Sequence, residues 1–416
     1  MTRRVVVTGL GAVTPLGNDV ATFWRRLVAG ESGVRRIEAF DPARVDSQVA
    51  GEVVDFDPSA VLERKEIRRN DRYTQFMLVA GREAMASAAL PERLEGELAD
   101  NAGAIIGSGI GGSTTLADQF ATLAERGPDR LSPFFIPMSI ANIGSGQAAI
   151  TFNLRGPNWA TVSACATAGH AIGEATETIL RGDAELMLAG GSEAPIIEAF
   201  VGAFAAMRAL STRNDDPATA SRPFDEGRDG FVIAEGAAVL VLEELGHAQR
   251  RGAPILAEVL GYGATADASH ITLPAPGGEG GARAARRALQ KARVAPDEVD
   301  HISAHATSTP EGDPAELAGF RSVFGEHSPK VSITATKGAI GHTLGAAGAI
   351  GAVATIMAMR DGCVPPTINL HDPSPAVGNL DVTPLTARRR EVSTALVNAF
   401  GFGGQNSALV LRRWTG

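Results

Sequence analysis

Short apolar runs alternate along the chain with longer segments in which apolar side chains recur every three or four residues. Runs of the first kind are typical of buried strands, and the spacing of the second kind is typical of helices. The runs predict strands at residues 4–8, 104–106, 185–189, 238–243, 255–260, 302–305, 331–333, 395–398 and 408–412. The periodic segments predict helices at residues 21–29, 75–89, 170–181, 281–292, 314–324 and 345–360. This alternation predicts an α/β fold in which helices cover the faces of the sheet.

Composition and charge argue against several classes of protein. The net charge of −9 disfavours general nucleic-acid binding. Two cysteines cannot form a disulfide framework, and the chain opens directly on a strand, with no signal peptide. We also expect no apolar run long enough to span a membrane. These features predict a cytoplasmic protein that binds neither nucleic acid nor membrane. The stretch Arg250-Arg-Gly-Ala-Pro254 marks a plausible boundary between two parts of the chain.

Three glycine-rich segments, residues 9–11, 107–112 and 401–404, invite comparison with nucleotide-binding loops. The first follows a strand, but Thr14 stands where the dinucleotide fingerprint needs its third glycine. The second matches the spacing of that fingerprint only in letters, and no phosphate-loop lysine follows it. We therefore interpret the glycines as allowing tight turns and close packing, and the last segment as a possible flexible wall near an active site.

Cys165 is the strongest candidate for a reacting group. It lies among small residues, between an apolar run at 159–162 that resembles a strand and a segment with helical periodicity. A thiol at the beginning of a helix is approached by backbone N–H groups, which favour the thiolate. Cys363 has neither a helix start nor a base nearby, and we interpret it as a small structural side chain.

Three further segments combine residues that carry chemistry: 304–316, 336–348 and 398–406. The first has His305 at a strand end, followed by hydroxyls and carboxylates, and the second has Lys337 and His342 before a helix of very small residues. The third is a glycine-lined loop at a strand end. A lone histidine is more often structural, and a lysine near carboxylates is usually a surface pair. Their combination with Cys165 nevertheless favours a catalytic site, and no spacing matches a zinc site. His170, on the predicted Cys165 helix, could approach that site.

Further motifs make the chain similar to the β-ketoacyl-acyl-carrier-protein synthases of the condensing-enzyme (thiolase-fold) superfamily, above all to their synthase II type. The resemblance extends almost from end to end and includes residues 5–11, 132–137, 211–217, 221–225, 228–232 and 365–370. It implies a thiolase-like fold with two pseudo-symmetric halves in five layers, α-β-α-β-α. The halves would be residues 1–252, which carry the nucleophile, and residues 253–416, which carry the two histidines. It also implies a homodimer.

The resemblance assigns roles to individual residues. The catalytic residues would be Cys165, His305 and His342, with Lys337 and Glu316 as a buried ion pair behind the histidines. The backbone N–H groups of Cys165 and Phe400 would stabilise an oxyanion, and Phe400 would also act as a gate with Gly401, Phe402, Gly403 and Gly404. Thr307 and Thr309 would hold the phosphopantetheine arm, and the acyl pocket would be lined by Ile110, Phe134 and Phe231. No metal and no bound cofactor are implied, because phosphopantetheine arrives on the carrier protein.

The implied reaction is a decarboxylative Claisen condensation. The Cys165 thiolate would take an acyl chain from an acyl-carrier thioester. Two neutral imidazoles would then stabilise the enolate that forms when malonyl-carrier loses CO2. The chain departs from common family residues at Ala306, Gly338, Gln405 and Glu235, but none of these positions supplies a reacting group.

The implied partner, an acyl carrier protein, is acidic, so docking requires a basic patch. Lys65, Arg68 and Arg69 are spaced to share one helix face, and the resemblance adds Arg130 and Arg208. An ordinary solvated helix face would have the same pattern. Two other functions remain open: a specialised type II polyketide or polyene ketosynthase, and a non-catalytic chain-length factor. The latter lacks the reactive cysteine, so Cys165 argues against it.

Overall fold

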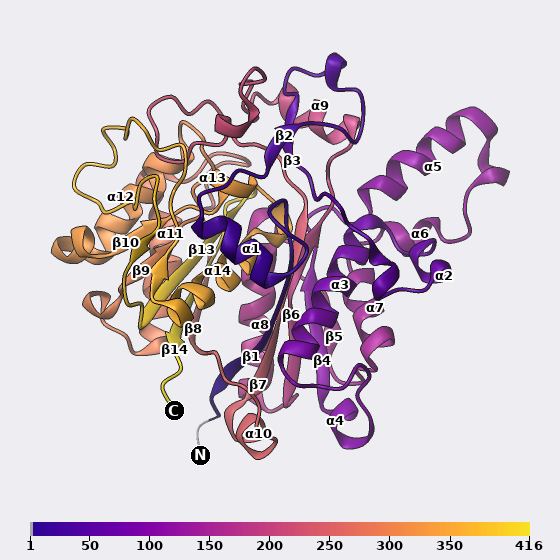
Figure 1. Ribbon diagram of the computed structural model, residues 1–416, viewed down its shortest axis with the longest axis horizontal. Helices are drawn as coiled ribbons and strands as arrows, with labels where there is room; N and C mark the ends of the chain where they lie inside the picture. Colours follow the sequence, from indigo (N-terminus) through magenta and orange to yellow (C-terminus); the bar gives the residue numbers. More distant parts are fainter. Residues whose placement is uncertain (1–2) are drawn as a thin grey trace.

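The computed structural model describes residues 3–416, and its centre is a mixed sheet with strands in the order β10-β9-β13-β14-β8-β1-β7-β6-β4-β5 (Figure 1). The strands are β1 (Val5–Val13), β4 (Ala102–Gly107), β5 (Asn158–Trp159), β6 (Leu186–Glu193), β7 (Gly236–Glu244), β8 (Ala257–Ala266), β9 (His301–Ser303), β10 (Ser332–Thr334), β13 (Thr394–Gly401) and β14 (Gln405–Arg413). Two small sheets pair β2 (Val34–Arg36) with β3 (Val49–Gly51), and β11 (Cys363–Val364) with β12 (Arg388–Arg389). The two strands at the centre of the large sheet, β1 and β8, are antiparallel.

The helices form three layers: one on the N-terminal strands, one on the C-terminal strands, and one between these two parts of the sheet. They are α1 (Val20–Val28), α2 (Arg64–Ile67), α3 (Arg72–Ser87), α4 (Gly96–Asp100), α5 (Ser113–Arg126), α6 (Phe135–Ser139), α7 (Ile143–Phe152), α8 (Thr167–Arg181), α9 (Glu198–Ala206), α10 (Leu245–Arg250), α11 (Glu279–Ala292), α12 (Gly312–Phe324), α13 (Lys337–Ile340) and α14 (Ala347–Asp361). Helices α3 and α7 pack on the strands of the N-terminal part, and α11 and α12 pack on those of the C-terminal part. Helices α8 and α14 contact each other and strands of both parts, so the predicted five-layer order is confirmed.

The predicted elements are found, with different ends. The first strand continues past Gly9 to Val13 through an irregularity in its pairing with β7. The glycines there allow α3 to approach closely, because a Cβ at Gly11 would lie 1.8 Å from the carbonyl oxygen of Ala80. The strand expected at 302–305 ends at Ser303, so His305 lies in the loop beyond it. The run at 159–162 is not a buried strand: only Asn158–Trp159 pairs, at the exposed edge.

One helical stretch corrects the expectation about membrane spans. Leu344–Asp361 is long and apolar enough to cross a membrane by length and composition, although 89% of it is buried inside the protein. It comprises a short 3-10 turn and α14, which packs between the two parts of the sheet. Its apolar character therefore has a structural explanation in the protein core.

Candidate active site

A cavity of about 400 Å³ collects side chains from distant parts of the sequence. Cys165 lies in a 3-10 turn just before α8, His305 follows β9, His342 follows α13, and Phe400 is near the end of β13. All four line the cavity. The structure thus brings together residues from the Cys165 segment and from all three further segments that the sequence singled out.

The turn that carries Cys165 has an unusual backbone. Ala164 adopts a left-handed conformation with φ of 49°, which a residue with a Cβ seldom adopts outside functional turns. The turn is held by a hydrogen bond from the Ser163 N–H to the Thr167 hydroxyl, at 2.9 Å. A Cβ at Gly401 would lie 2.4 Å from the carbonyl oxygen of Ser163, so the backbone of the glycine loop packs against the turn more closely than any other residue type would allow.

Electrostatics around the Cys165 sulfur differ from the prediction. Burial raises the pKa of the thiol to about 12, while the positive charge of Lys337 and the backbone N–H of Phe402 act in the opposite direction. The helix start does not outweigh the loss of water around the sulfur. Burial therefore opposes the thiolate that the helix start is expected to favour.

The two histidine rings lie next to each other at the cavity, in an edge-to-face arrangement. The ring centroids of His305 and His342 lie 5.4 Å apart, with their planes at 85°. Burial lowers the pKa of each imidazole well below 6.5, and the charge of Lys337 lowers it further. Both rings are therefore neutral at neutral pH, and each carries one N–H donor. Both ring nitrogens of His342 are buried with no hydrogen-bond partner in the described chain, which leaves its N–H free for an oxygen in the cavity.

Lys337 and Glu316 do not form the predicted ion pair. Among the described residues 3–416, no nitrogen–oxygen contact within 4.0 Å joins them. Lys337 Nζ instead donates to the His305 carbonyl at 2.5 Å, and the Glu316 carboxylate accepts from the N–H groups of His305, at 2.8 Å, and Ala306, at 2.7 Å. The turn at Ala306, with φ of 24°, directs these N–H groups toward Glu316. The two charges thus hold the backbone of His305 from opposite ends.

This arrangement predicts a pH-dependent loss of stability in Lys337→Met. Burial raises the pKa of Glu316, and Lys337 is the nearby charge that opposes this rise. Without Lys337 the folded state holds the Glu316 proton to higher pH, so the free energy of unfolding should fall as pH rises from 6 to 8, by roughly 1–3 kcal/mol. Urea unfolding at both pH values measures it. The double variant Lys337→Met/Glu316→Gln should lose the part of the pH dependence that Glu316 contributes, and an unchanged pH dependence relative to Lys337→Met would disprove the coupling.

The buried histidines predict a second pH effect. The unfolded chain protonates a histidine near pH 6.5, whereas folded His342 resists protonation, so acid favours the unfolded state. Between pH 6.5 and 5.5 the wild type should lose about 1 kcal/mol of stability relative to His342→Gln. Chemical unfolding measures the free energy of unfolding of both proteins at each pH. Titratable groups other than His342 contribute equally to both proteins, so their contributions cancel in the difference. A constant difference would mean that His342 titrates normally when folded.

Further predicted residues surround the reacting groups. The Phe400 ring lies 5.4 Å from the His305 ring, centroid to centroid, and packs against Gly281. Gly401 and Phe402 line the cavity, and the Gly403 N–H donates to the Ile271 carbonyl at 2.7 Å. The cavity wall also includes Ile110, Phe231, Thr307 and Thr309, with the two threonine hydroxyls 3.1 Å apart.

Phe134 is placed differently. It is not among the described residues that line the cavity, and it lies on the surface, 37% exposed, with the Arg69 guanidinium 4.6 Å from the centre of its ring. The prediction that it lines the acyl pocket is wrong for a single chain. The cause is that α6 and the loop before it extend outward, away from the central sheet (Figure 1).

The basic residues are exposed, but not as one helix face. Helix α2 comprises only Arg64–Ile67, so Arg68 and Arg69 lie beyond its end, and the predicted shared face is wrong. Lys65, Arg68, Arg69, Arg130 and Arg208 are all exposed, and Arg208 also lines the cavity. The five residues remain candidates for binding an acidic partner.

Glu193, at the end of β6, is a residue that sequence reasoning missed. It is fully buried and accepts hydrogen bonds from the Ser108 hydroxyl (2.6 Å) and from three N–H groups, of Gly109 (2.8 Å), Ile110 (3.1 Å) and Gly345 (2.9 Å). The glycine-rich segment 107–112 therefore binds a carboxyl group of the protein itself, that of Glu193. The signal in the sequence was the glycine loop itself, although its partner could not be read from spacing.

His170 does approach the Cys165 turn, although it does not line the cavity in the described chain. Its Nε2 lies 3.2 Å from the Asn406 carbonyl, which can only accept, so Nε2 carries the proton. Its Nδ1 then accepts from the Ser163 hydroxyl at 2.6 Å. The ring joins the turn before Cys165 to β14, which follows the glycine loop.

Comparisons with known proteins agree over nearly the whole chain. Residues 2–248 match the family described as "Beta-ketoacyl synthase, N-terminal domain", and residues 256–371 match "Beta-ketoacyl synthase, C-terminal domain". The 3-oxoacyl-[acyl-carrier-protein] synthase 2 of Coxiella burnetii is 47% identical over 99% of both chains, and that of Staphylococcus aureus (strain N315) is 46% identical over 99% of both. A beta-ketoacyl synthase from Burkholderia phymatum superposes with a TM-score of 0.92 at 36% identity, over 99% of this chain and 100% of that one. A type II polyketide ketosynthase, solved with its acyl-carrier protein, superposes with a TM-score of 0.90 at 34% identity over 100% of both.

Proposed function

Because the chain belongs to the β-ketoacyl synthase family, we propose that Cys165, His305 and His342 perform its reaction. The enzyme condenses an acyl chain with malonyl-acyl-carrier protein in type II fatty-acid elongation, giving β-ketoacyl-acyl-carrier protein and CO2. The observation that carries the proposal is the presence, in one cavity, of a buried thiol and two neutral imidazoles, one of which has no hydrogen-bond partner at either nitrogen among the residues that the structure describes.

The first step loads the acyl chain. The sulfur of Cys165 attacks the carrier thioester, a new S–C bond forms, and the thiol proton leaves with the carrier thiol. The nearby Lys337 charge and the Phe402 N–H favour the negative sulfur as the proton departs. The backbone N–H groups of Cys165 and Phe400 are the proposed donors to the oxyanion, and the glycine loop beside Phe400 lets the backbone approach.

The second step uses the imidazoles. Loss of CO2 from malonyl-carrier places negative charge on the thioester oxygen of the enolate, and the N–H groups of His305 and His342 donate to that oxygen. A neutral imidazole suits this task because its N–H donates a hydrogen bond to the enolate oxygen with no change in the ring's own protonation. The enolate carbon then attacks the Cys165 thioester: the new C–C bond gives β-ketoacyl-carrier, the S–C bond breaks, and the released Cys165 thiolate takes up a proton from water to restore the thiol.

The direct experiment follows mass and product together. The protein is incubated with acyl-carriers of graded chain length, its intact mass is measured, and malonyl-carrier is then added. We expect a stable acyl adduct that disappears as a β-ketoacyl-carrier two carbons longer forms. No adduct with any carrier would overturn the proposal. Repeated condensation without reduction would favour the alternative, a specialised polyketide or polyene ketosynthase, a class to which one structural relative belongs.

Docking of the acidic carrier gives a separate prediction. The double charge reversal Lys65→Glu/Arg69→Glu should raise KM for acyl-carrier substrates about tenfold at low salt, because long-range attraction and rim contacts are lost. High salt should shrink the effect. Steady-state kinetics measure it, with Arg36→Glu, an exposed arginine on β2, as the matched control. An unchanged KM at low salt would disprove the docking role.

We also propose that two copies of the chain pair. Large apolar side chains are exposed on α6 and just after it, on α7, and on β5 and just after it: Ile136 (62%), Ile140 (40%), Ile150 (65%), Trp159 (38%) and Val162 (58%). Strand β5 ends the sheet and has one unpaired edge. An exposed apolar area beside a free edge is typical of an interface between copies. Sedimentation at micromolar concentration tests it. A cytoplasmic location, and catalysis without a metal or bound cofactor, stay predictions.

A further inference from the structure

The loop that carries Thr307 and Thr309 has an unfavourable backbone. Ala306 and Ser308 are both left-handed, with φ of 24° and 68°, although neither is glycine. Such residues each cost on the order of 1–3 kcal/mol and persist only where the surroundings hold them. Ser308 is held by three bonds: its N–H donates to Asp313 at 3.0 Å, its carbonyl accepts from Gly230, and its hydroxyl accepts from the Arg222 N–H.

Arg228 holds the next part of the same loop. Its Nε donates to the Thr309 carbonyl and one terminal nitrogen to the Pro310 carbonyl, both at 3.1 Å. Its other terminal nitrogen donates to the Asp225 carbonyl at 2.9 Å. The guanidinium therefore connects two successive carbonyls of the loop to the segment 222–230. Its side chain is only 10% exposed, so these bonds face little competition from water.

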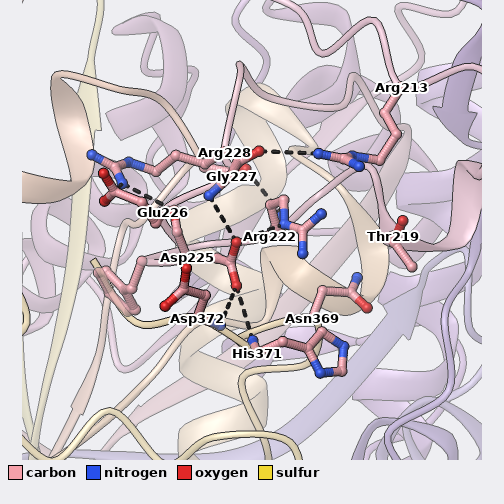
Figure 2. Close-up of polar contacts among 12 residues, drawn as sticks. Arg213, Thr219, Arg222, Asp225, Glu226, Gly227, Arg228, Asn369, His371 and Asp372 are labelled. Atoms are coloured by element: carbon pink, nitrogen blue, oxygen red, sulfur yellow. Dashed lines mark hydrogen bonds and ion pairs between the residues drawn. The ribbon is translucent and has the colours of Figure 1, made fainter.

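Asp225 anchors that segment in turn. Figure 2 shows its carboxylate among four donors: the Arg222 side chain and the backbone N–H groups of Gly227, His371 and Asp372, at 2.8–2.9 Å. Asp225 is almost fully buried. Arg228 therefore extends from a segment that these hydrogen bonds hold in place. Through Asp225 and Arg228, the loop 306–310 is connected to residues 371–372.

We propose that Arg228 is a positioning residue for the phosphopantetheine arm of the substrate, and that it acts by fixing the carbonyls of Thr309 and Pro310. The inference rests on the proposed function, in which the hydroxyls of Thr307 and Thr309 meet the amides of that arm. These hydroxyls lie at the cavity wall and can match the amide groups only if the left-handed loop keeps its shape. Arg228 itself does not line the cavity in the described chain.

The test compares two acyl donors. Acylation of Cys165 is followed by intact mass with hexanoyl-acyl-carrier protein, which presents the whole arm, and with the hexanoyl thioester of ethanethiol, which has no amides. Arg228→Gln should lower the second-order rate constant about tenfold with the carrier, through a raised KM, which corresponds to about 1.4 kcal/mol. The rate constant with the ethanethiol ester should stay within twofold of wild type.

Controls separate positioning from folding. Arg213→Gln removes another arginine of the same cluster, which bonds to the Gly227 carbonyl but has no hydrogen bond to the loop 306–310, and should not change either rate. Arg228→Lys, which reaches one carbonyl rather than two, should give a smaller loss with the same substrate dependence. Thermal unfolding of each variant reports its folding.

Each outcome has a distinct meaning. An equal loss with both donors, or no loss with either, would overturn the role of Arg228. Failure of the wild type to be acylated by any carrier would instead overturn the proposed function. If Arg228→Gln does not fold, Arg228→Lys decides the question by the same comparison of donors.

Discussion

Cys165→Ala is expected to acquire no acyl mass from any acyl-carrier and to lose condensation by at least about 10⁴-fold, because no other nucleophile can hold the acyl chain. The variant should still release CO2 from malonyl-carrier. In the proposed mechanism the imidazoles of His305 and His342 would stabilise the enolate formed in that step, and the substitution does not alter them. The loss should thus be confined to one of the two half-reactions.

Two measurements check this expectation. Intact mass with acyl-carrier reports the first half-reaction, and CO2 release from malonyl-carrier reports the second. Cys363→Ala is the matched control, since this half-exposed cysteine lies outside the cavity and should behave as wild type. A residual acyl adduct on Cys165→Ala would show that another residue is the nucleophile. Complete loss of CO2 release would show that the sulfur takes part in decarboxylation.

His342→Ala is expected to show the opposite pattern. Acyl transfer to Cys165 should stay close to the wild-type rate, whereas condensation should fall by about 10²–10³-fold, the cost of removing one donor to a developing oxyanion, roughly 3–4 kcal/mol. The physical reason is that neither ring nitrogen of His342 has a hydrogen-bond partner among residues 3–416, and in the proposed mechanism the ring meets an acceptor only when the enolate forms. His342→Gln, whose amide N–H can reach a similar position, should recover part of the loss.

This pair of rates also separates two roles for His342. If the imidazole were a base for the thiol, as in a cysteine protease, acylation would fall together with condensation. If it donates to the enolate, only condensation falls. Equal losses in both steps would therefore disprove the donor role. Circular dichroism and thermal unfolding confirm that each variant has folded before its rates are compared.

Much of the fold could be predicted because its core is built from buried apolar strands that alternate with helices of regular apolar spacing. The apolar run Val5–Val7 and the periodic helices follow the strict spacing that burial imposes, so their positions could be read from residue types alone. The run at 159–162 failed for a physical reason. An apolar run indicates that its side chains are shielded from water, but it does not show whether the same chain or another one shields them. Trp159 and Val162 are exposed in the single chain.

The candidate site was predicted less completely, because its supporting bonds use the backbone. The resemblance located Cys165, His305 and His342, yet it suggested that Lys337 and Glu316 bond to each other rather than to the peptide groups around His305. Glu193 was missed for the same reason. Three of its four partners are N–H groups, which every residue but proline has, so no residue type marks them in the sequence.

The strand order has a consequence for how the protein is made on the ribosome. Strands β1, β4, β5, β6 and β7 are all synthesised before β8, and they form one side of the sheet with β1 at its inner edge. A nascent chain that has reached only β7 therefore exposes that edge of β1, a template for aggregation, until β8 emerges and pairs with it. A pause in translation after β7 has left the ribosome and before β8 has done so would prolong this exposure and lower the yield of folded enzyme.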